Sequence, residues 1–325
     1  MPTPIELAKR QKEILAKVDA ANLERVSQAY QLMYSRLSGD VEALRLAIEA
    51  MDNPTQAAIK QLAQYKALVR KAEKELARFT AYLETVIDRA SYEAIQLGLS
   101  DSAALIKAAG ITAQLQGIAP NAMREALRYL AEDGRLYKRL QLLTGATVDK
   151  VSQAIFEGIG AGWNPRKIAS AIQDAFGGGL TDALRNTRTV QLYSYRDATR
   201  ANYMASDVIV TGWIWWAELD ELTCEACVSE HGSIHGLDET LSGHYNCRCA
   251  ALPYIEGLTE PEQTGESWFN SLTEAQQREF MGQSKYEAYQ DGKFSFSDLR
   301  QFNENEVYGQ MIGVTPLKDL LGGDE

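Results

Sequence analysis

The chain has 325 residues, 45% apolar and 24% charged, which is enough material for two or three structural units with buried cores. No run approaches the roughly 18 apolar residues that a membrane span needs, and the N-terminal sequence has no apolar signal-peptide core, so we expect the protein to stay in the cytoplasm where it is made. The net charge of −11 is uneven, because residues 208–325 carry 6 Lys+Arg and 21 Asp+Glu; this acidity argues against nonspecific DNA contact through the C-terminal third.

Two long helices are predicted at the N-terminal end. A capping box of Thr3 and Glu6 begins the first, which extends about nine turns to a stop at Ser38–Gly39. Apolar residues over 58–90 alternate steps of four and three, the heptad pattern of a coiled-coil seam. With a turn near 53–56, the pair predicts an extended antiparallel hairpin, although an ordinary bundle core explains the same apolar positions.

Shorter helices follow in the middle of the chain. The expected ranges, each bounded by Gly, Asn or Pro, are 101–109, 120–142, 147–159 and 164–175. The glycines of 177–179 predict the clearest break, after which Thr181 begins a helix to about Ser206. Four arginines share one face of that last helix: Arg185, Arg188, Arg196 and Arg200. This stripe docks an acidic partner or the chain's own acidic C-terminal part, or it is simply a solvated face.

The hydrophobic period changes to that of a strand over residues 207–218. Alternation places Trp213 and Trp215 on one side, with Ile214 and Trp216 on the other. We expect these tryptophans to pack inside a small domain rather than to form a binding surface.

The rest of the chain predicts a second strand at 252–257 and, from Trp268, short helices with stops at Gly282 and Gly292. The expected fold is mainly α with a small α+β zinc-binding module near 206–257. Three regions follow from this reading: an extended helical N-terminal region at 1–145, the module with its helical lead-in at 146–257, and an acidic helical tail at 258–325.

Every cysteine and every histidine of the chain lies in one window, 224–249. Two close cysteine pairs in a cytoplasmic chain hold a metal more often than a disulfide, although a pair of disulfides stays open for an oxidising exterior. The C-x2-C and H-x2-C spacings favour one structural Zn2+ per chain. Its five candidate ligands are Cys224, Cys227, His244, Cys247 and Cys249.

Cys224, Cys227 and Cys247 are expected in every version of this site. Cys249 and His244 compete for the fourth position, with a slight preference for Cys249. His231 and His235 are expected to be surface loop residues rather than ligands, because Gly232 between them disfavours a helix. The loop between the pairs has little to bury, so metal binding would supply its folding free energy. A thiol enzyme would leave the other cysteines without a role, and the zinc deaminase pattern is missing.

The segments "GWIWWAELDELTCEACVSEHGSIHG" and "GHYNCRCAALPY" resemble the C-terminal module of the Mu F-like phage head morphogenesis, or minor capsid, proteins. The likeness covers about 147–310, and His-x-Asn-Cys-Arg-Cys is its specific part; Tyr245 stands where the family commonly has Pro. The matching positions are Trp213, Trp215, Asp220, Cys224, Cys227, Gly232, His244, Asn246, Cys247, Arg248, Cys249 and Pro253.

The resemblance implies a low-copy protein of a tailed-phage virion, in the capsid interior or at the portal vertex, that acts in procapsid assembly and is a candidate for DNA ejection. The partners it implies are the portal protein, the major capsid protein or a scaffolding protein, with no membrane and no small-molecule substrate. We expect a structural protein and not an enzyme. The alternatives are a phage-delivered nuclease or toxin on the same module, and a DNA-binding zinc ribbon. Arg248 is expected to donate to a carboxylate, with Asp220 as the candidate.

Overall fold

The mainly helical character predicted from the sequence is confirmed in a computed structural model, which describes residues 3–110, 118–127, 130–131, 134–161, 163–206 and 209–322. The chain forms two compact units, one of residues 1–16, 91–127 and 191–325 (unit 1) and one of 17–90 and 128–190 (unit 2). Each unit gathers separate stretches of the chain. The three consecutive regions predicted above stay a prediction.

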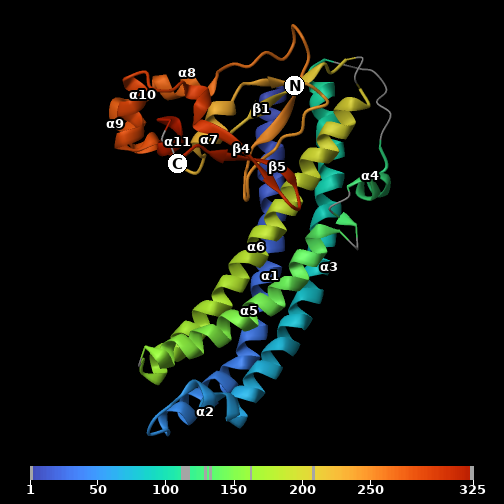
Figure 1. Cartoon of the computed structure of the whole chain (residues 1–325). Coiled ribbons are helices and arrows are strands. Elements are labelled where there is room, and N and C mark those ends of the chain that lie inside the picture. The colour runs from blue at the N-terminus through green and yellow to red at the C-terminus, as the bar shows by residue number, and fades with distance from the viewer. Residues whose placement is uncertain are drawn as a thin grey trace. The chain divides into compact units, whose positions relative to one another are not determined.

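Unit 2 contains the turn of the long helical hairpin (Figure 1). Helix α1 (Pro4–Glu49) pairs with α3 (Ala63–Ala108) in antiparallel order, because Arg36 bonds Glu75 at 2.9 Å while Asp40, nearer the turn, bonds Lys71 at 2.5 Å. The predicted antiparallel hairpin is thus present within this unit.

The predicted stop of the first helix at Ser38–Gly39 is wrong. Helix α1 continues ten residues further, and a Cβ at Gly39 would meet nothing within 4 Å. Val41, Leu44 and Ile48 extend the buried stripe beyond the glycine. Burial of this stripe outweighs the roughly 1 kcal/mol that one helical glycine costs.

The second predicted helix is divided and longer than expected. Short α2 (Gln56–Gln61) begins at Thr55, whose hydroxyl accepts from the Ala58 amide at 3.2 Å, and α3 follows from Ala63. Helix α3 also absorbs the separate helix predicted at 101–109. The predicted heptad seam is half-buried up to Val69 and buried beyond it. The buried seam residues are Ala72, Leu76, Phe79, Leu83, Val86 and Ala90.

Helix α6 (Pro165–Met204) runs unbroken through the three glycines, so the break predicted at 177–179 is wrong. A Cβ at Gly179 would lie 2.8 Å from the Tyr30 hydroxyl and 2.9 Å from the Thr147 hydroxyl. The Tyr30 hydroxyl in turn donates to the Phe176 carbonyl of α6. Gly179 therefore permits a close approach of helices α1 and α5 (Arg135–Gly160) to α6 instead of ending the helix.

Unit 1 contains the small sheet, in the order β2–β1–β3, with both pairs antiparallel. Its strands are β1 (Gly212–Trp216), β2 (Ile234–His235) and β3 (Ala250–Tyr254). Trp213 and Trp215 face a core that includes Cys227 and Cys247, whereas Ile214 and Trp216 face Ala8 of α1. The predicted alternation of the tryptophan strand is confirmed.

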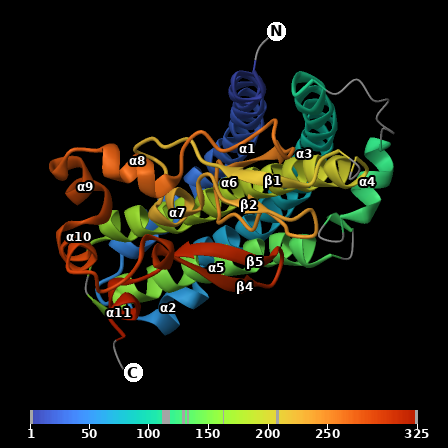
Figure 2. The ribbon, with the colours of Figure 1, turned by 90° about the horizontal axis from the view of Figure 1, so that it is seen from above.

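The other described residues of unit 1 form helices, loops and one hairpin that the sequence did not predict. Helix α4 (Pro120–Ala126) precedes the sheet and α7 (Glu225–Glu230) lies between β1 and β2. The tail contains α8 (Gly265–Ser271), α9 (Glu274–Met281), α10 (Gln283–Gln290), the 3-10 helix η2 (Phe296–Leu299) and α11 (Leu317–Leu320). Helices α8, α9 and α10 gather beside α7 (Figure 2).

The wholly helical tail predicted for 258–325 is therefore wrong in part. Residues Arg300–Asn305 (β4) and Gly309–Val314 (β5) pair as an antiparallel hairpin. Arg300 bonds buried Glu230 from β4, and the Ile312 amide bonds the Ser242 carbonyl from β5. Contacts distant in sequence favour the strands here.

We expect Gly178→Ala and Gly179→Ala to have opposite effects on stability. Gly178 faces open space, so alanine there should stabilise the helix by about 0.5–1 kcal/mol. Alanine at 179 should destabilise unit 2 by about 1–3 kcal/mol, because Tyr30 and Thr147 must move. Thermal unfolding followed by circular dichroism measures both, and a Gly179→Ala protein as stable as Gly178→Ala would contradict the close approach.

Candidate metal centre

Four thiols and one imidazole converge from two short segments of unit 1. Cys224 is the N-cap of α7 and Cys227 lies inside it, while His244, Cys247 and Cys249 lie in the loop that leads into β3. Asn246 has φ of 60°, in the left-handed region that asparagine tolerates better than most residues. The turn closes with the Cys247 amide on the His244 carbonyl at 3.1 Å.

The five side chains form two groups that share Cys227, and each group could hold a metal ion. In the first, His244 Nε2 lies 3.3 Å from the sulfurs of both Cys224 and Cys227. In the second, Cys227 Sγ lies 3.7 Å from Cys247 Sγ, and Cys249 completes the group. Within each group the ligand atoms lie within 4.8 Å of one another.

Within each group of three, these separations match those between pairs of ligands in a tetrahedral zinc site. With Zn–S near 2.3 Å and Zn–N near 2.05 Å, two sulfurs lie about 3.8 Å apart and a sulfur and a nitrogen about 3.5 Å apart. The His244 ring is also oriented for this role, because Nδ1 lies 2.7 Å from the Tyr245 carbonyl oxygen. With Nδ1 donating to this carbonyl, Nε2 is the nitrogen that faces the sulfurs, and it would bind a metal ion after losing its proton, as in many metal-bound histidines.

Two of the thiols are shifted toward the thiolate form. The hydrogen bond with Cys227 lowers the pKa of Cys224 to about 5, and hydrogen bonds from Cys227 and Cys249 hold the pKa of Cys247 well below its usual range. Burial acts against a charge on His244, but the hydrogen bond with Cys224 and the nearby thiolates raise its pKa to about 9. The cluster thus carries negative charge on sulfur, which is the form that binds a metal.

A buried arginine lies against the cluster. Arg196 of α6 donates from Nε to the Cys249 carbonyl at 3.0 Å and from Nη2 to the Cys247 carbonyl at 2.6 Å. A Cβ at Gly243 would collide with Arg196 Nη1 and approach Cys247 Sγ at 3.0 Å, so the loop needs glycine at this position. Neither a carboxylate nor any other group hydrogen-bonds Nη1 within the described part of the chain.

The predicted arginine stripe is therefore used within the chain. Arg200 donates to the Leu237 carbonyl at 3.1 Å, so both it and Arg196 contact the C-terminal part. Arg188 pairs with Asp19 at 2.6 Å in unit 2, and Arg185 with Asp182 at 3.5 Å. The groups that Arg196 and Arg200 bind are backbone carbonyls rather than the acidic side chains that the charge pattern indicated.

The predicted partner of Arg248 is confirmed. Its Nη1 donates to Asp220 Oδ2 at 2.8 Å and its Nη2 to the other carboxylate oxygen. The hydrogen bond from Arg248 lowers the pKa of Asp220 to about 2. This bidentate pair joins the Cys-Arg-Cys segment to the turn that precedes α7.

His231 and His235 lie outside both metal-binding groups, but the surface positions expected for them are wrong. His231 is buried and its Nδ1 accepts from the Ala217 amide at 3.0 Å. His235 stacks on Trp213 with 4.2 Å between ring centroids, and it contacts the carboxylates of Glu230 and Glu239 at 3.1 Å each. Both histidines therefore make contacts within the module and are not candidate metal ligands.

Two further ion pairs of the module were not anticipated from the sequence. Glu225 of α7 bonds Lys285 of α10 at 2.5 Å, and Lys285 also donates to the Thr315 carbonyl at 3.1 Å. Buried Glu230 bonds Arg300 of β4. No local pattern marks these pairs, because 60 and 70 residues separate the partners in the sequence.

The fold and the site define a mainly helical protein with a compact module built around a thiolate and imidazole cluster. Residues 149–252 match the family described as Phage Mu protein F like protein. The resemblance is thereby confirmed for these residues, so the chain carries a Phage Mu F-like region that includes all five candidate ligands and Arg196. The tail beyond Leu252, where a likeness was also predicted, lies outside the match.

This family match supports a role in phage head morphogenesis, with capsid-related partners and association with the virion. Among curated proteins and among solved structures, none matches the chain. Over the described residues, every helix is too short or too polar to cross a membrane.

Arg248→Lys tests the pair with Asp220. Lysine cannot make the bidentate contact, so the pKa of Asp220 should rise from about 2 toward the ordinary value near 3.9. In the wild type the stabilisation is fully present above about pH 4 and is lost as the pH falls through about 2. Both side chains are more than one-third exposed, so the cost at pH 7 should stay below about 1 kcal/mol. Carboxyl NMR titration measures the shift, and an unchanged Asp220 pKa would contradict the assignment.

Proposed function

We propose that the chain is a structural minor head protein of a tailed phage, acting at or near the portal vertex during procapsid assembly. The observation that carries the proposal is the family match over 149–252, which contains the whole Cys/His cluster. The acidic C-terminal third, with 21 Asp+Glu against 6 Lys+Arg, favours protein partners such as the portal, major capsid or scaffolding protein over DNA. Ejection with the DNA stays a prediction.

The same proposal includes one structural Zn2+ held by Cys224, Cys227, His244 and Cys247. His244 Nε2 lies 3.3 Å from both Cys224 Sγ and Cys227 Sγ, and Cys227 Sγ lies 3.7 Å from Cys247 Sγ, so Cys227 links the other three. When bound, the ion joins α7 to the loop before β3 and supplies folding free energy to a segment with little core of its own. Cys249 then lies beside the centre as a fourth sulfur that does not bind the ion.

Charge balance supports His244 over Cys249 as the fourth ligand. Zn2+ with three thiolates and a neutral imidazole has a net charge of −1, and the buried Arg196 guanidinium neutralises it. Four thiolates would leave one negative charge uncompensated in the core, which is costly. The initial preference for Cys249 is therefore replaced by a proposal for His244.

The proposed role is structural rather than catalytic. Four protein ligands fill a tetrahedral zinc site and leave no coordination position for a substrate or an activated water. Cys227 and Cys247 are also buried, at 2% and 1% exposure, so the centre faces the core.

Metal analysis of two single variants tests the ligand set. Cys249→Ser should keep about one zinc per chain, whereas His244→Ala should bind zinc much more weakly, because it loses one of four ligands. In Co2+-substituted protein, the thiolate-to-metal absorption should be unchanged by Cys249→Ser. Loss of zinc from Cys249→Ser with retention in His244→Ala would select Cys249 instead, and wild-type protein that folds without metal through two disulfides would overturn the zinc centre.

Localisation in assembled heads tests the function. Procapsids assembled with this chain should contain it in low copy, cross-linked to the portal protein, and Cys224→Ser should be incorporated poorly because its module does not fold. Cys249→Ser is the matched control and should be incorporated normally. Even labelling over the whole shell would contradict the portal placement, and heads of normal yield and composition without the chain would contradict the assembly role.

A further inference from the structure

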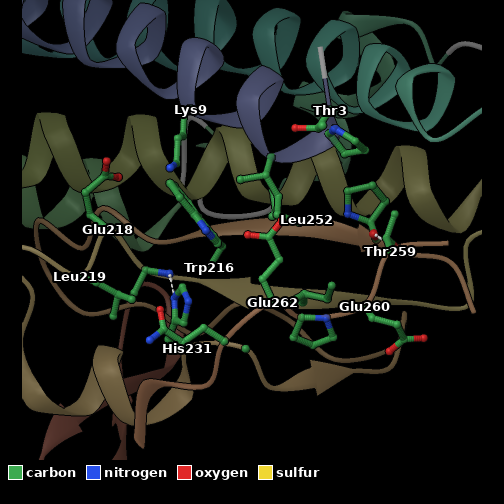
Figure 3. Close-up of a pocket in the computed structure, with 18 of the residues that line it drawn as sticks. Thr3, Lys9, Trp216, Glu218, Leu219, His231, Leu252, Thr259, Glu260 and Glu262 are labelled. Atoms are coloured by element: carbon green, nitrogen blue, oxygen red, sulfur yellow. Dashed lines mark hydrogen bonds between the residues drawn. The ribbon is translucent and has the colours of Figure 1, made fainter. Parts of the chain in front are cut away.

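Unit 1 contains a cavity of about 520 Å3 on the face of the sheet opposite the metal centre. The first turns of α1, the Ile214 and Trp216 face of β1, and the loop at 258–263 enclose it (Figure 3). Its volume lies within the usual range of ligand pockets. None of the five candidate metal ligands lines it.

The floor of the cavity offers a hydrogen-bond donor of fixed direction. His231 Nδ1 accepts the Ala217 amide at 3.0 Å, so the single proton of the neutral ring lies on Nε2. Burial lowers the pKa of His231 to about 4, which keeps the ring neutral near pH 7. The Nε2 proton has no acceptor among the hydrogen bonds of the described residues, and His231 lines the cavity.

Negative charge predominates around an apolar surface. Glu262 points into the cavity in Figure 3 and makes no hydrogen bond or ion pair with any described residue. Glu218 is bound to Lys12, whose ammonium also covers one face of Trp216 at 4.2 Å. The apolar part of the lining comes from side chains that include Ile5, Ile214, Trp216, Leu252 and Leu258.

We propose that this cavity docks a short segment of a partner protein that carries a lysine or arginine next to an apolar residue. The cation pairs with Glu262, the apolar side chain packs on Trp216 and Leu252, and a backbone carbonyl accepts from His231 Nε2. Glu218 is paired with Lys12, which leaves two carboxylates, Glu260 and Glu262, against one lining lysine, Lys9. This balance disfavours phosphate or carboxylate ligands by simple charge complementarity. Every peptide segment supplies the carbonyl, whereas the cation and the apolar residue provide selectivity.

Peptide titration of the full-length protein tests this docking site. The probe is an acetylated, amidated Gly-Leu-Arg-Leu-Gly peptide, and the matched control peptide has Glu in place of Arg. The Arg peptide should shift the side-chain NMR resonances of Trp216 and His231, and the Glu peptide should bind at least about tenfold more weakly. Raising the salt concentration should weaken binding of the Arg peptide, because salt screens its ion pair with Glu262.

The variant Glu262→Gln should bind the Arg peptide about tenfold more weakly than the wild type does. Glu256→Gln is the matched control, since Glu256 is an exposed carboxylate next to the same loop but outside the cavity, and it should bind as the wild type does. Equal affinities of wild type and Glu262→Gln, or equal losses in the two variants, would overturn the proposal. Spermidine that binds the cavity as tightly as the Arg peptide would also overturn it, by showing a site for small polycations.

Discussion

The contact between the Arg196 guanidinium and the carbonyls of Cys247 and Cys249 is the interaction on which the module depends. A buried cation without a carboxylate partner is costly unless negative charge lies nearby. Here the thiolates of the cluster are the negative charge. Burial acts to lower the pKa of Arg196, and the electrostatic interaction with Cys247 is the largest of the effects that raise it. Helix α6 and the Cys-Arg-Cys segment are therefore joined by charge as well as by hydrogen bonds, and the cluster and the helix support each other.

Ion pairs near the cluster connect the module to the tail. Arg248, between the two cysteines, holds Asp220 ahead of α7, while Glu225 and Glu230 of α7 bind Lys285 and Arg300. Both lysine and arginine partners come from the region beyond the family match. The tail is thus built into unit 1 rather than appended to it, and two of its five lysine and arginine residues make these contacts.

Local signals in the sequence were sufficient for much of this structure. The capping box of Thr3 and Glu6, the heptad seam of α3 and the alternation of Trp213 to Trp216 depend on neighbours a few residues away, and each is present. The Asp220–Arg248 pair was also accessible, because both residues belong to one motif. The spacing within each segment predicts that its cysteines and histidine lie close together, whereas the fold brings the two segments to one place.

The remaining features depend on partners that no local pattern identifies. Glycines at 177–179 predict a break only if nothing packs on them, and Tyr30 and Thr147 do pack on Gly179. The hairpin of β4 and β5 is fixed by Glu230 and Ser242, both more than 50 residues earlier. The sequence predicts Arg196 as part of an exposed arginine stripe, whereas in the structure it is buried against the carbonyls of Cys247 and Cys249. The proposal of His244 as the fourth ligand likewise depends on the position of Arg196, because one buried positive charge balances three thiolates and an imidazole better than four thiolates.

The two faces of the small sheet also differ in how their charges are balanced. On the Trp213 and Trp215 face, the buried Arg196 guanidinium balances the negative charge of the thiolates. On the Ile214 and Trp216 face, Glu262 lines the cavity and forms no ion pair with any described residue. A single five-residue strand therefore has the thiolate and imidazole cluster of the proposed metal centre on one side and the proposed docking cavity on the other, and the alternation of β1 keeps the two apart.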